Sequence, residues 1–448
     1  PPRSTLFPYT TLFRSYSVLR PSGGDTSVKE IYFEALVPLL KDVPMAREVN
    51  MNLGYRYSDY SSVGGVSAYK IDVDWSIIDA LRLRGGYNRS VRAPSVGELY
   101  APESSGSTGI GSPSATTPFG GDPCDVRSGY RGGFGQSGAN AAKVEALCLA
   151  MGVPAGVLPT YQFGSAQVFA LTGGNPDLQE ETTDTYSLGA VVQSQFTSPL
   201  LNRTSTSLDW YSIEVTGAVG NLPIIQTIEN CFNLNGGNPN YDVNNYYCQV
   251  MGTRNPTTGF LFEPGQPALN LGAFKVSGVD LQIDWSFDLA DIGLPASAGS
   301  LSLGTVVSYV DKFEIQNLPG GPSYNYAGSR GTAVEDGAGL AHPDWKANTT
   351  LSYSRDWMSV SLRWRHTAAM ISAEQVRSAA STTLGVDSYD VFDLNGRFTL
   401  PHDLSMRVGV ANLFNKEPPQ VGNFAGTYDG QNYDTLGRYY SISVTKSF

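Results

Sequence analysis

The 448-residue sequence has no hydrophobic run approaching the roughly 20 residues that a membrane-spanning helix requires. Charged residues make up only 16% of the chain, and there are only 3 histidines. No His-Glu-x-x-His, Gly-x-Ser-x-Gly or Walker motif is present, so the corresponding metalloprotease, serine-hydrolase and nucleotide sites are not predicted. We therefore expect neither an enzyme nor a resident metal or cofactor.

The formal net charge is −11 at pH 7. An excess of acid repels phosphate backbones, so we do not expect nucleic acid as a partner. The mean hydropathy is only −0.18. Any contact with a membrane must therefore come from alternating strands, which a hydropathy window does not detect.

The clearest pattern is the alternation of apolar and acidic residues in 277–289, SGVDLQIDWSFDL. Because successive side chains of a strand point to opposite faces, this segment predicts a strand with one apolar and one acidic face. Its length and its aromatic end fit a strand that crosses a bilayer, with lipid outside and water inside. We interpret Asp280, Asp284 and Asp288 as a polar row that faces a wet lumen rather than as catalytic acids.

The same alternation recurs and predicts about thirteen strands along the chain. They lie near residues 28–38, 48–60, 66–77, 80–92, 180–194, 202–216, 270–288, 299–314, 344–354, 357–368, 387–399, 403–413 and 435–448. Arg363 and Arg365 belong to the polar face of one of them, since an arginine facing lipid at the midplane would cost about 2–4 kcal/mol.

The predicted connections alternate between short and long from residue 78 onward. Before residue 78, the link at 61–65 is short where this alternation would place a long loop. The long connections are 93–179, 217–269, 315–343, 369–386 and 414–434. Outer-membrane barrels have short turns at the periplasmic rim and long loops outside. We therefore predict an all-β fold, a transmembrane, antiparallel, up-and-down β-barrel.

Strand parity predicts that the chain is the C-terminal portion of a larger barrel. Bacterial barrels have an even number of strands, and an open edge in lipid costs several kcal/mol for each unsatisfied backbone group. The predicted number is odd, so we expect residues 16–448 to form part of a barrel. Residues 1–15, PPRSTLFPYTTLFRS, repeat TLF and RS, and we interpret them as a non-native adaptor segment.

The four cysteines form two local pairs in predicted loops, Cys124 with Cys148 and Cys231 with Cys248. Four cysteines allow three pairings, and pairing within each loop is favoured because each pair is local. Metal binding is the alternative, although no Cys-x-x-Cys or nearby histidine supports it. Disulfides would place the loops in an oxidising compartment. Residues 140–151 also predict a short amphipathic helix that Cys148 would staple.

Aromatic residues suggest two further roles. Loop tyrosines are candidates for contact with a ligand, namely Tyr241, Tyr246, Tyr247, Tyr324 and Tyr326. Strand aromatics suit the girdles at membrane interfaces, namely Trp75, Trp285, Trp364, Tyr440 and Phe448.

Five segments together resemble the barrel of TonB-dependent outer-membrane receptors. They are NRSVRAPSVGELY (88–100), NPDLQEETTDTYSLGA (175–190), FKVSGVDLQIDWSF (274–287), VANLFNKEPP (410–419) and GRYYSISVTKSF (437–448). The matching positions are Arg92, Ala93, Pro94, Glu98, Asn175, Pro176, Asn412, Leu413, Phe414 and Phe448. Proline ends a strand ladder and Asn-Pro turns the chain, so we interpret these positions as barrel architecture.

The resemblance implies a barrel of about 22 strands filled by an N-terminal plug. It also implies uptake driven by a TonB complex across the outer membrane of a Gram-negative bacterium. Typical cargo is a siderophore, haem, cobalamin, metal or glycan. This sequence departs from the pattern, since it contains no plug or TonB box, and we expect transport to belong to the parent protein. The alternatives are a passive porin or autotransporter barrel, and a soluble all-β protein.

Overall fold

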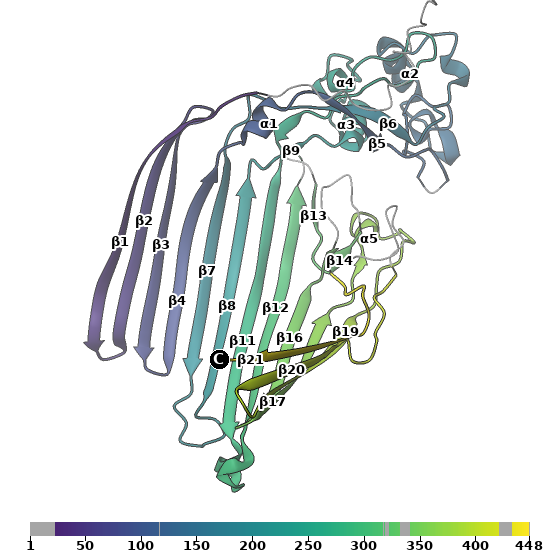
Figure 1. Ribbon diagram of the computed structural model, residues 1–448. Helices are drawn as coiled ribbons and strands as arrows, with labels where there is room; N and C mark the ends of the chain where they lie inside the picture. The colour runs from purple at the N-terminus through teal and green to yellow at the C-terminus, as the bar shows by residue number, and fades with distance from the viewer. Residues whose placement is uncertain are drawn as a thin grey trace, which may run out of the picture.

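The structure is a computed structural model that describes residues 23–115, 117–316, 318, 322–331, 341–420 and 432–447. Its main feature is one sheet of 14 strands in which neighbours along the chain pair in order, and β13 (Ser323–Asn325) pairs only with β12 (Figure 1). The predicted adaptor segment 1–15 and the terminal Phe448 lie outside the described residues.

The strands along the path of the sheet match the predicted strands one for one. They are β1 (Val28–Val43), β2 (Ala46–Tyr60), β3 (Gly64–Ile78), β4 (Leu81–Arg92), β7 (Glu181–Gln193), β8 (Thr204–Thr216), β11 (Ala273–Asp288), β12 (Ser300–Gln316), β16 (Trp345–Arg355), β17 (Met358–Thr367), β19 (Tyr389–Leu400), β20 (Leu404–Ala411) and β21 (Tyr439–Lys446). The clearest difference is β1, which continues past the predicted end at residue 38. The register of its pairing with β2 shifts between Pro38 and Leu40, which indicates a β-bulge. A bulge accommodates the proline, which has no N–H to donate, and the ladder continues beyond it.

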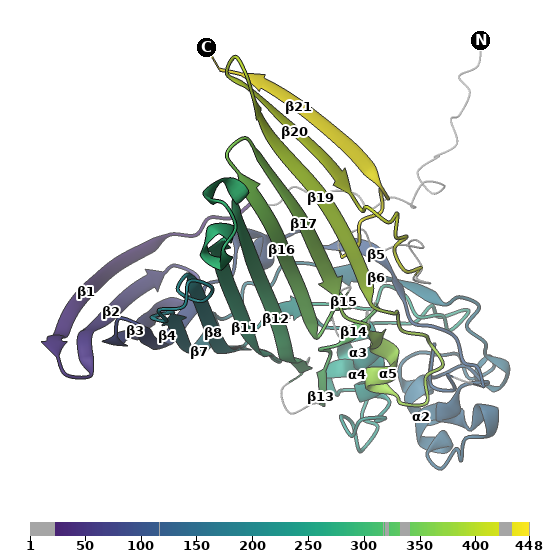
Figure 2. The same cartoon turned by 90° about the horizontal axis from the view of Figure 1, so that it is seen from below.

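All neighbouring strands on this path are antiparallel, and the long connections gather at one end of the sheet (Figure 1). Figure 2 shows that the sheet curves strongly from β1 round to β21. The strands β1 and β21 do not pair with each other in the described part of the chain. The fold is therefore a curved, open wall of an up-and-down barrel.

The register gives this wall two chemically distinct faces. On β11, Leu281 lies opposite Leu208 and Val307, whereas Asp280 lies opposite Asp209 and Ser308. The larger hollows of the sheet are lined mainly by the polar face, so this face is the concave one. We call it the inner face and the apolar one the outer face. The predicted polar row at Asp280, Asp284 and Asp288 lies on the inner face, as do Arg363 and Arg365.

Aromatic residues mark the lower end of the outer face, next to the short turns. Trp75 and Trp285 donate from Nε1 to the carbonyl oxygens of Met45 and Leu200, at 2.9 and 2.6 Å. The hydroxyl of Tyr353 donates to the carbonyl oxygen of Ala298, at 2.7 Å. Each ring therefore has one polar atom tied to a turn and an apolar body on the outer face, as residues at a membrane interface do.

Further aromatic residues lie towards the long loops on the same outer face. Trp210 and Tyr309 lie opposite Val279 of β11, which is six residues before Trp285. Trp364 on β17 donates to Asp390 at 2.8 Å, and Tyr440 on β21 is exposed opposite Val410. The apolar band between the two groups of aromatics spans about 20 Å along the strand at about 3.4 Å per residue.

The long connections contain their own secondary structure. It comprises α1 (Val96–Tyr100), β5 (Ser104–Gly109), α2 (Ala141–Ala150), β6 (Gln167–Thr172), β9 (Val219–Asn221), α3 (Ile224–Cys231), α4 (Tyr246–Val250), β10 (Ala268–Asn270), β14 (Ser329–Arg330), β15 (Ala341–His342), β18 (Ile371–Ser372) and α5 (Ala373–Arg377). The helix α2 confirms the predicted helix at 140–151. In the described residues, no helix has the length and apolar character needed to cross a membrane.

Candidate functional site

The inner face carries an ion pair that spans three strands. Arg84 on β4 donates from Nε and Nη2 to both carboxylate oxygens of Asp209 on β8, at 2.7 and 2.6 Å. The strand β7 lies between them, and its residue at this level is Gly189. A Cβ atom there would overlap Asp209 Oδ1, so the ion pair depends on glycine. The positions of these two charges are thus fixed.

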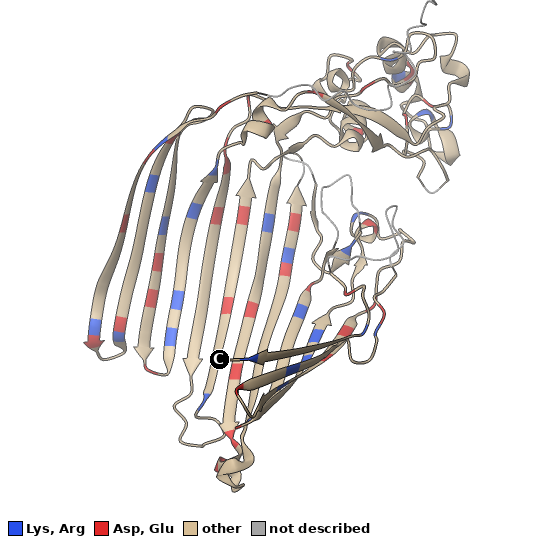
Figure 3. Ribbon diagram, in the orientation of Figure 1, with Lys and Arg blue, Asp and Glu red and all other residues tan. Residues whose placement is uncertain are grey.

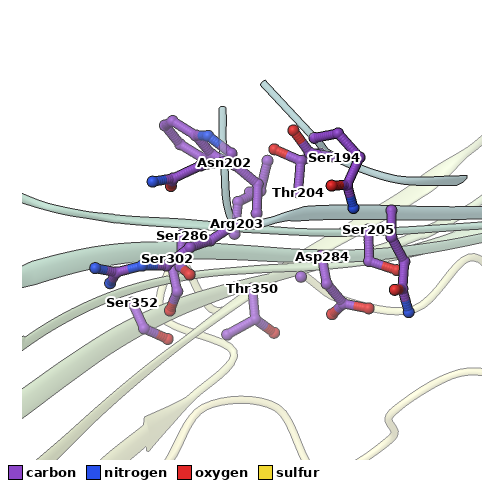
Figure 4. Close-up of a pocket in the computed structure, with 15 residues that line it drawn as sticks. Ser194, Asn202, Arg203, Thr204, Ser205, Asp284, Ser286, Ser302, Thr350 and Ser352 are labelled. Carbon is purple, nitrogen blue, oxygen red and sulfur yellow. The ribbon is translucent and has the colours of Figure 1, made fainter. Parts of the chain in front are cut away.

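A hollow of the inner face with a volume of about 600 Å³ lies near the turn that joins β7 to β8. Figure 4 shows small hydroxyl side chains around it, among them Ser205, Ser286 and Ser302, together with Asp284. Such side chains offer hydrogen bonds to a polar ligand or polypeptide. In the part of the chain that the structure describes, no group of three or more His, Cys, Asp or Glu side chains is placed to hold a metal.

The roots of two long loops meet at a charged clamp, which we define as Arg92, Glu98 and Glu181. Arg92 binds Glu181 through Nε and Nη2 at 2.5 and 2.6 Å, and Glu98 through Nη1 and Nη2 at 2.9 and 3.0 Å. Glu181 also accepts from the backbone N–H of Val219 at 2.7 Å, and Val219 begins β9 in the second loop. One guanidinium group therefore ties the end of β4, the start of β7 and both loops.

Asn175, which begins the family-like segment 175–190, completes the connection between the two loops. Asn175 donates from its backbone N–H to the carbonyl of Glu98 at 2.8 Å, and from Nδ2 to the carbonyl of Ala268 at 2.9 Å. Beside these bonds, Leu99, Leu178 and Ala268 form a small buried core. Ala93 and Pro94 follow the end of β4 at Arg92, and Pro176 lies in a turn. We infer an architectural role for these motif positions.

The Asn-Leu-Phe-Asn segment forms the turn that leaves β20. Asn412 is fully buried, and its backbone N–H donates to Asp393 at 2.9 Å while its side chain accepts from Lys416 N–H at 2.7 Å. Asn412 and Asn415 both have positive φ, at 51° and 53°, which asparagine tolerates better than most residues. Leu413 donates to the carbonyl of Phe392 at 2.6 Å, and Phe414 is exposed.

The two longest loops pack against each other into a lobe with its own hydrophobic core (Figure 1). The core contains both disulfides, which join Cys124 to Cys148 and Cys231 to Cys248, so pairing is within each loop. The loops 93–180 and 217–272 each contribute one disulfide. An ordered lobe of this size gives the end of the barrel a rigid surface, as recognition loops on a scaffold require.

A buried ion pair joins the two loops inside the lobe. Arg254 binds Asp122 through Nη1 and Nη2 at 2.6 and 2.8 Å, and both side chains are fully buried. Tyr161 donates its hydroxyl to Asp122 at 2.7 Å. Burial, together with the neighbouring carboxylate, raises the pKa of Tyr161, so the phenol stays protonated and keeps donating.

The disulfides should stabilise the lobe without being needed by the sheet. Reduction of both, or replacement of Cys124 and Cys148 by serine, should destabilise the lobe by on the order of 3 kcal/mol for each bridge lost. The sheet should remain folded, because its ladders involve neither pair. Protease digestion should show faster cleavage in the lobe alone. A loss of heat-resistant mobility on gels would show instead that the sheet depends on the bridges.

The clamp should respond to acid. The hydrogen bonds from Arg92 lower the pKa of Glu98 from its usual 4.5 to about 2, so folding favours the carboxylate. The resulting stability is fully present above pH 4.5 and is lost as the pH falls towards 2. The protection of the amides at the loop roots, measured as hydrogen exchange relative to the intrinsic rate at each pH, should therefore fall between pH 5 and pH 2. Glu98→Gln should show little protection at both pH values, whereas Glu103→Gln, in the same loop, should behave like the parent chain.

The predicted ligand-contact tyrosines occupy different environments. Tyr246 at the start of α4 is half exposed and meets the ring of Tyr247 edge-on at 5.6 Å. Tyr241 is partly buried and lies under the ammonium group of Lys143, at 5.6 Å. Tyr324 is partly buried, and Tyr326 is fully buried against Ile315 and Ala373. The lobe and β13 therefore hold separate tyrosine groups, and their contact with a ligand stays a prediction.

Sequence reasoning missed the residues whose partners are distant. These are Arg84, Asp209, Asp122, Arg254 and Glu181. Gly189 is the one local signal of the Arg84–Asp209 pair, since a glycine inside a strand often marks a position that another group approaches closely.

These features define a class of protein, a large transmembrane β-barrel, of which this chain forms a curved part of the wall with a polar inner face and ordered loops at one rim. The sequence pattern of the family described as "TonB dependent receptor-like, beta-barrel" matches residues 3–413, and the chain belongs to this family. No curated protein sequence matches the chain.

Solved structures share the fold. A mutant ferric enterobactin receptor from Pseudomonas aeruginosa has a TM-score of 0.57 and 14% identity, over 94% of this chain and 45% of that one. The siderophore receptor PirA from Acinetobacter baumannii has a TM-score of 0.53 and 17% identity, over 95% and 47% of the two chains. A second mutant of the Pseudomonas receptor, in complex with enterobactin, has a TM-score of 0.55 and 15% identity, over 94% and 46%. The chain thus spans about half the length of these receptors.

Proposed function

We propose that the chain forms the barrel wall of a receptor in the outer membrane of a Gram-negative bacterium. In this proposal the receptor takes up a scarce ligand with energy delivered by a TonB complex, which engages a region outside this chain. The observation that carries the proposal is the disulfide-stapled lobe clamped at one end of a wall whose inner face is polar. A passive pore has no need of an ordered lobe with its own core, whereas a receptor needs a fixed surface to bind its ligand.

The ligand classes consistent with the family are siderophores, haem, cobalamin and glycans. A ferric siderophore is the first to test, because the structures with the same fold are siderophore receptors. Tyr246 has the most exposed ring of the candidate tyrosines, so it is the first proposed contact residue. Tyr241, Tyr247 and Tyr324 offer smaller surfaces, and Tyr326 would need a rearrangement to reach a ligand.

The test expresses the intact receptor in a bacterial strain from which the chromosomal gene for this receptor has been deleted. Under iron limitation, we expect one class of ferric chelate to restore growth, and removal of TonB to abolish the effect. Tyr246→Ala should weaken ligand binding, whereas Tyr440→Ala, on the exposed outer face of β21, should not. Uptake that continues without TonB would contradict the proposal and favour a passive pore.

A further inference from the structure

Two arginines face each other on the inner face near the short turn between β19 and β20. Arg397 on β19 and Arg407 on β20 are directly opposite in the antiparallel register, and both are exposed. Like charges in directly opposite positions destabilise a sheet. In the described residues neither guanidinium group has an ion-pair or hydrogen-bond partner. Asp393, on the same face of β19, is already bound by Arg365 at 2.9 and 3.1 Å.

Several other arginines of the inner face have a polar partner. Arg82, Arg84 and Arg203 each pair with an aspartate, at distances between 2.6 and 3.6 Å. Arg363 has no acidic partner, but its Nε donates to Asn348 at 2.9 Å. Figure 3 shows positive charge along the C-terminal strands of the sheet. Among the described residues there, Arg397 and Arg407 differ from Arg363 and Arg365 in having neither an acidic nor an amide partner.

The two guanidinium groups border a hollow of about 340 Å³. Hydroxyl and amide side chains line much of the rest, namely Ser359, Ser361, Asn395, Ser441 and Ser443, and Gly396, Val408 and Ile442 complete the lining. No carboxylate lines it among the described residues. The hollow thus combines two planar cationic groups with neutral donors, which is a chemical environment suited to a carboxylate or a phosphate.

We propose that Arg397 and Arg407 together bind an oxyanion, a carboxylate or a phosphate, that bridges the two guanidinium groups. The bound anion removes the repulsion between them and accepts hydrogen bonds from the serine hydroxyls. The oxyanion has two possible sources, a free anionic solute in the lumen or an acidic side chain of the receptor's own polypeptide inside the barrel. The site is separate from the loops and does not depend on the identity of the transported ligand.

The test is a calorimetric titration of the full chain in detergent micelles with inorganic phosphate. We expect binding that weakens as salt is added, because the site is open to solvent. Arg397→Gln and Arg407→Gln should each weaken binding at least tenfold. The matched control is Arg56→Gln, which removes an isolated inner-face arginine that lies 5.8 Å from the ring of Tyr32, and it should leave binding unchanged. Absence of phosphate binding, or binding by either variant as tight as that of the parent chain, would overturn the proposal.

A second measurement guards against a folding defect in the variants. Without phosphate, Arg407→Gln should raise the midpoint of thermal unfolding because it removes the like-charge contact, and phosphate should no longer raise it further. A lower midpoint than that of the parent chain would count against the pair being repulsive. The same titration on the intact receptor identifies the source. Binding that persists there indicates a free solute, and binding seen only in the isolated chain indicates a carboxylate of the receptor itself.

Discussion

Replacing Leu281 with arginine is expected to lower the free energy of unfolding of the membrane-inserted chain by about 2–4 kcal/mol. Leu281 lies on the outer face between the upper and lower aromatic groups, opposite Leu208 and Val307. An arginine there would face hydrocarbon, where no water or counter-charge solvates it. Urea titration in liposomes, followed by tryptophan fluorescence, measures the change.

The neighbouring residue provides the matched control. Gln282 lies on the inner face, where its side chain donates to Asp284 at 2.7 Å. Gln282→Arg places the same charge at nearly the same depth but in a polar environment beside a carboxylate, so we expect little change in the free energy of unfolding. Equal losses in the two variants would show that the assignment of the faces is wrong.

Replacing Asp122 with alanine is expected to destabilise the loop lobe by about 3–5 kcal/mol. The change leaves the guanidinium group of Arg254 fully buried without its counter-charge, and it also removes the acceptor of the Tyr161 hydroxyl. The loss should be confined to the lobe, because no ladder of the sheet includes either residue. Hydrogen exchange of the backbone amides in loops 93–180 and 217–272 measures it.

An exposed ion pair serves as the control for this variant. Arg47 and Asp79 lie 2.7 Å apart with 59% of each side chain exposed, so Asp79→Ala should cost about 0–1 kcal/mol. A second variant, Asp122→Leu with Arg254→Met, should recover much of the lost stability, since it removes both charges together. If Asp122→Ala left exchange in the lobe unchanged, the buried pair would not be what joins the two loops.

Much of the sheet could be predicted because its signal is local. Alternation with a period of two residues identifies each strand without knowledge of its neighbours, and β11 shows it most clearly. The end of β1 was missed because Pro38 reads as a strand terminator, whereas a bulge there lets the ladder continue to Val43. A bulge depends on the partner strand, which the sequence of one strand does not reveal.

The contacts that hold the loops could not be predicted in the same way. Asp122 and Arg254 are 132 residues apart, and Arg84 and Asp209 are 125 apart, so no local pattern connects them. The cysteines were different, since each pair lies within one loop and the nearest partner is the correct one. The five tyrosines have similar sequence contexts, yet Tyr326 is buried while Tyr246 is half exposed, because exposure depends on how the loops pack.

If β11 separates lipid from water, labels along this strand should be accessible to the two phases in alternation. All four native cysteines are in disulfides, so single cysteines can be introduced at positions 279 to 286 and spin-labelled. In lipid vesicles we expect odd-numbered labels to collide with oxygen dissolved in the bilayer, and even-numbered labels to collide with a water-soluble nickel complex. Accessibility without this two-residue period, or a nickel complex that reaches both sets equally, would show that β11 does not have one face in lipid and the other in water.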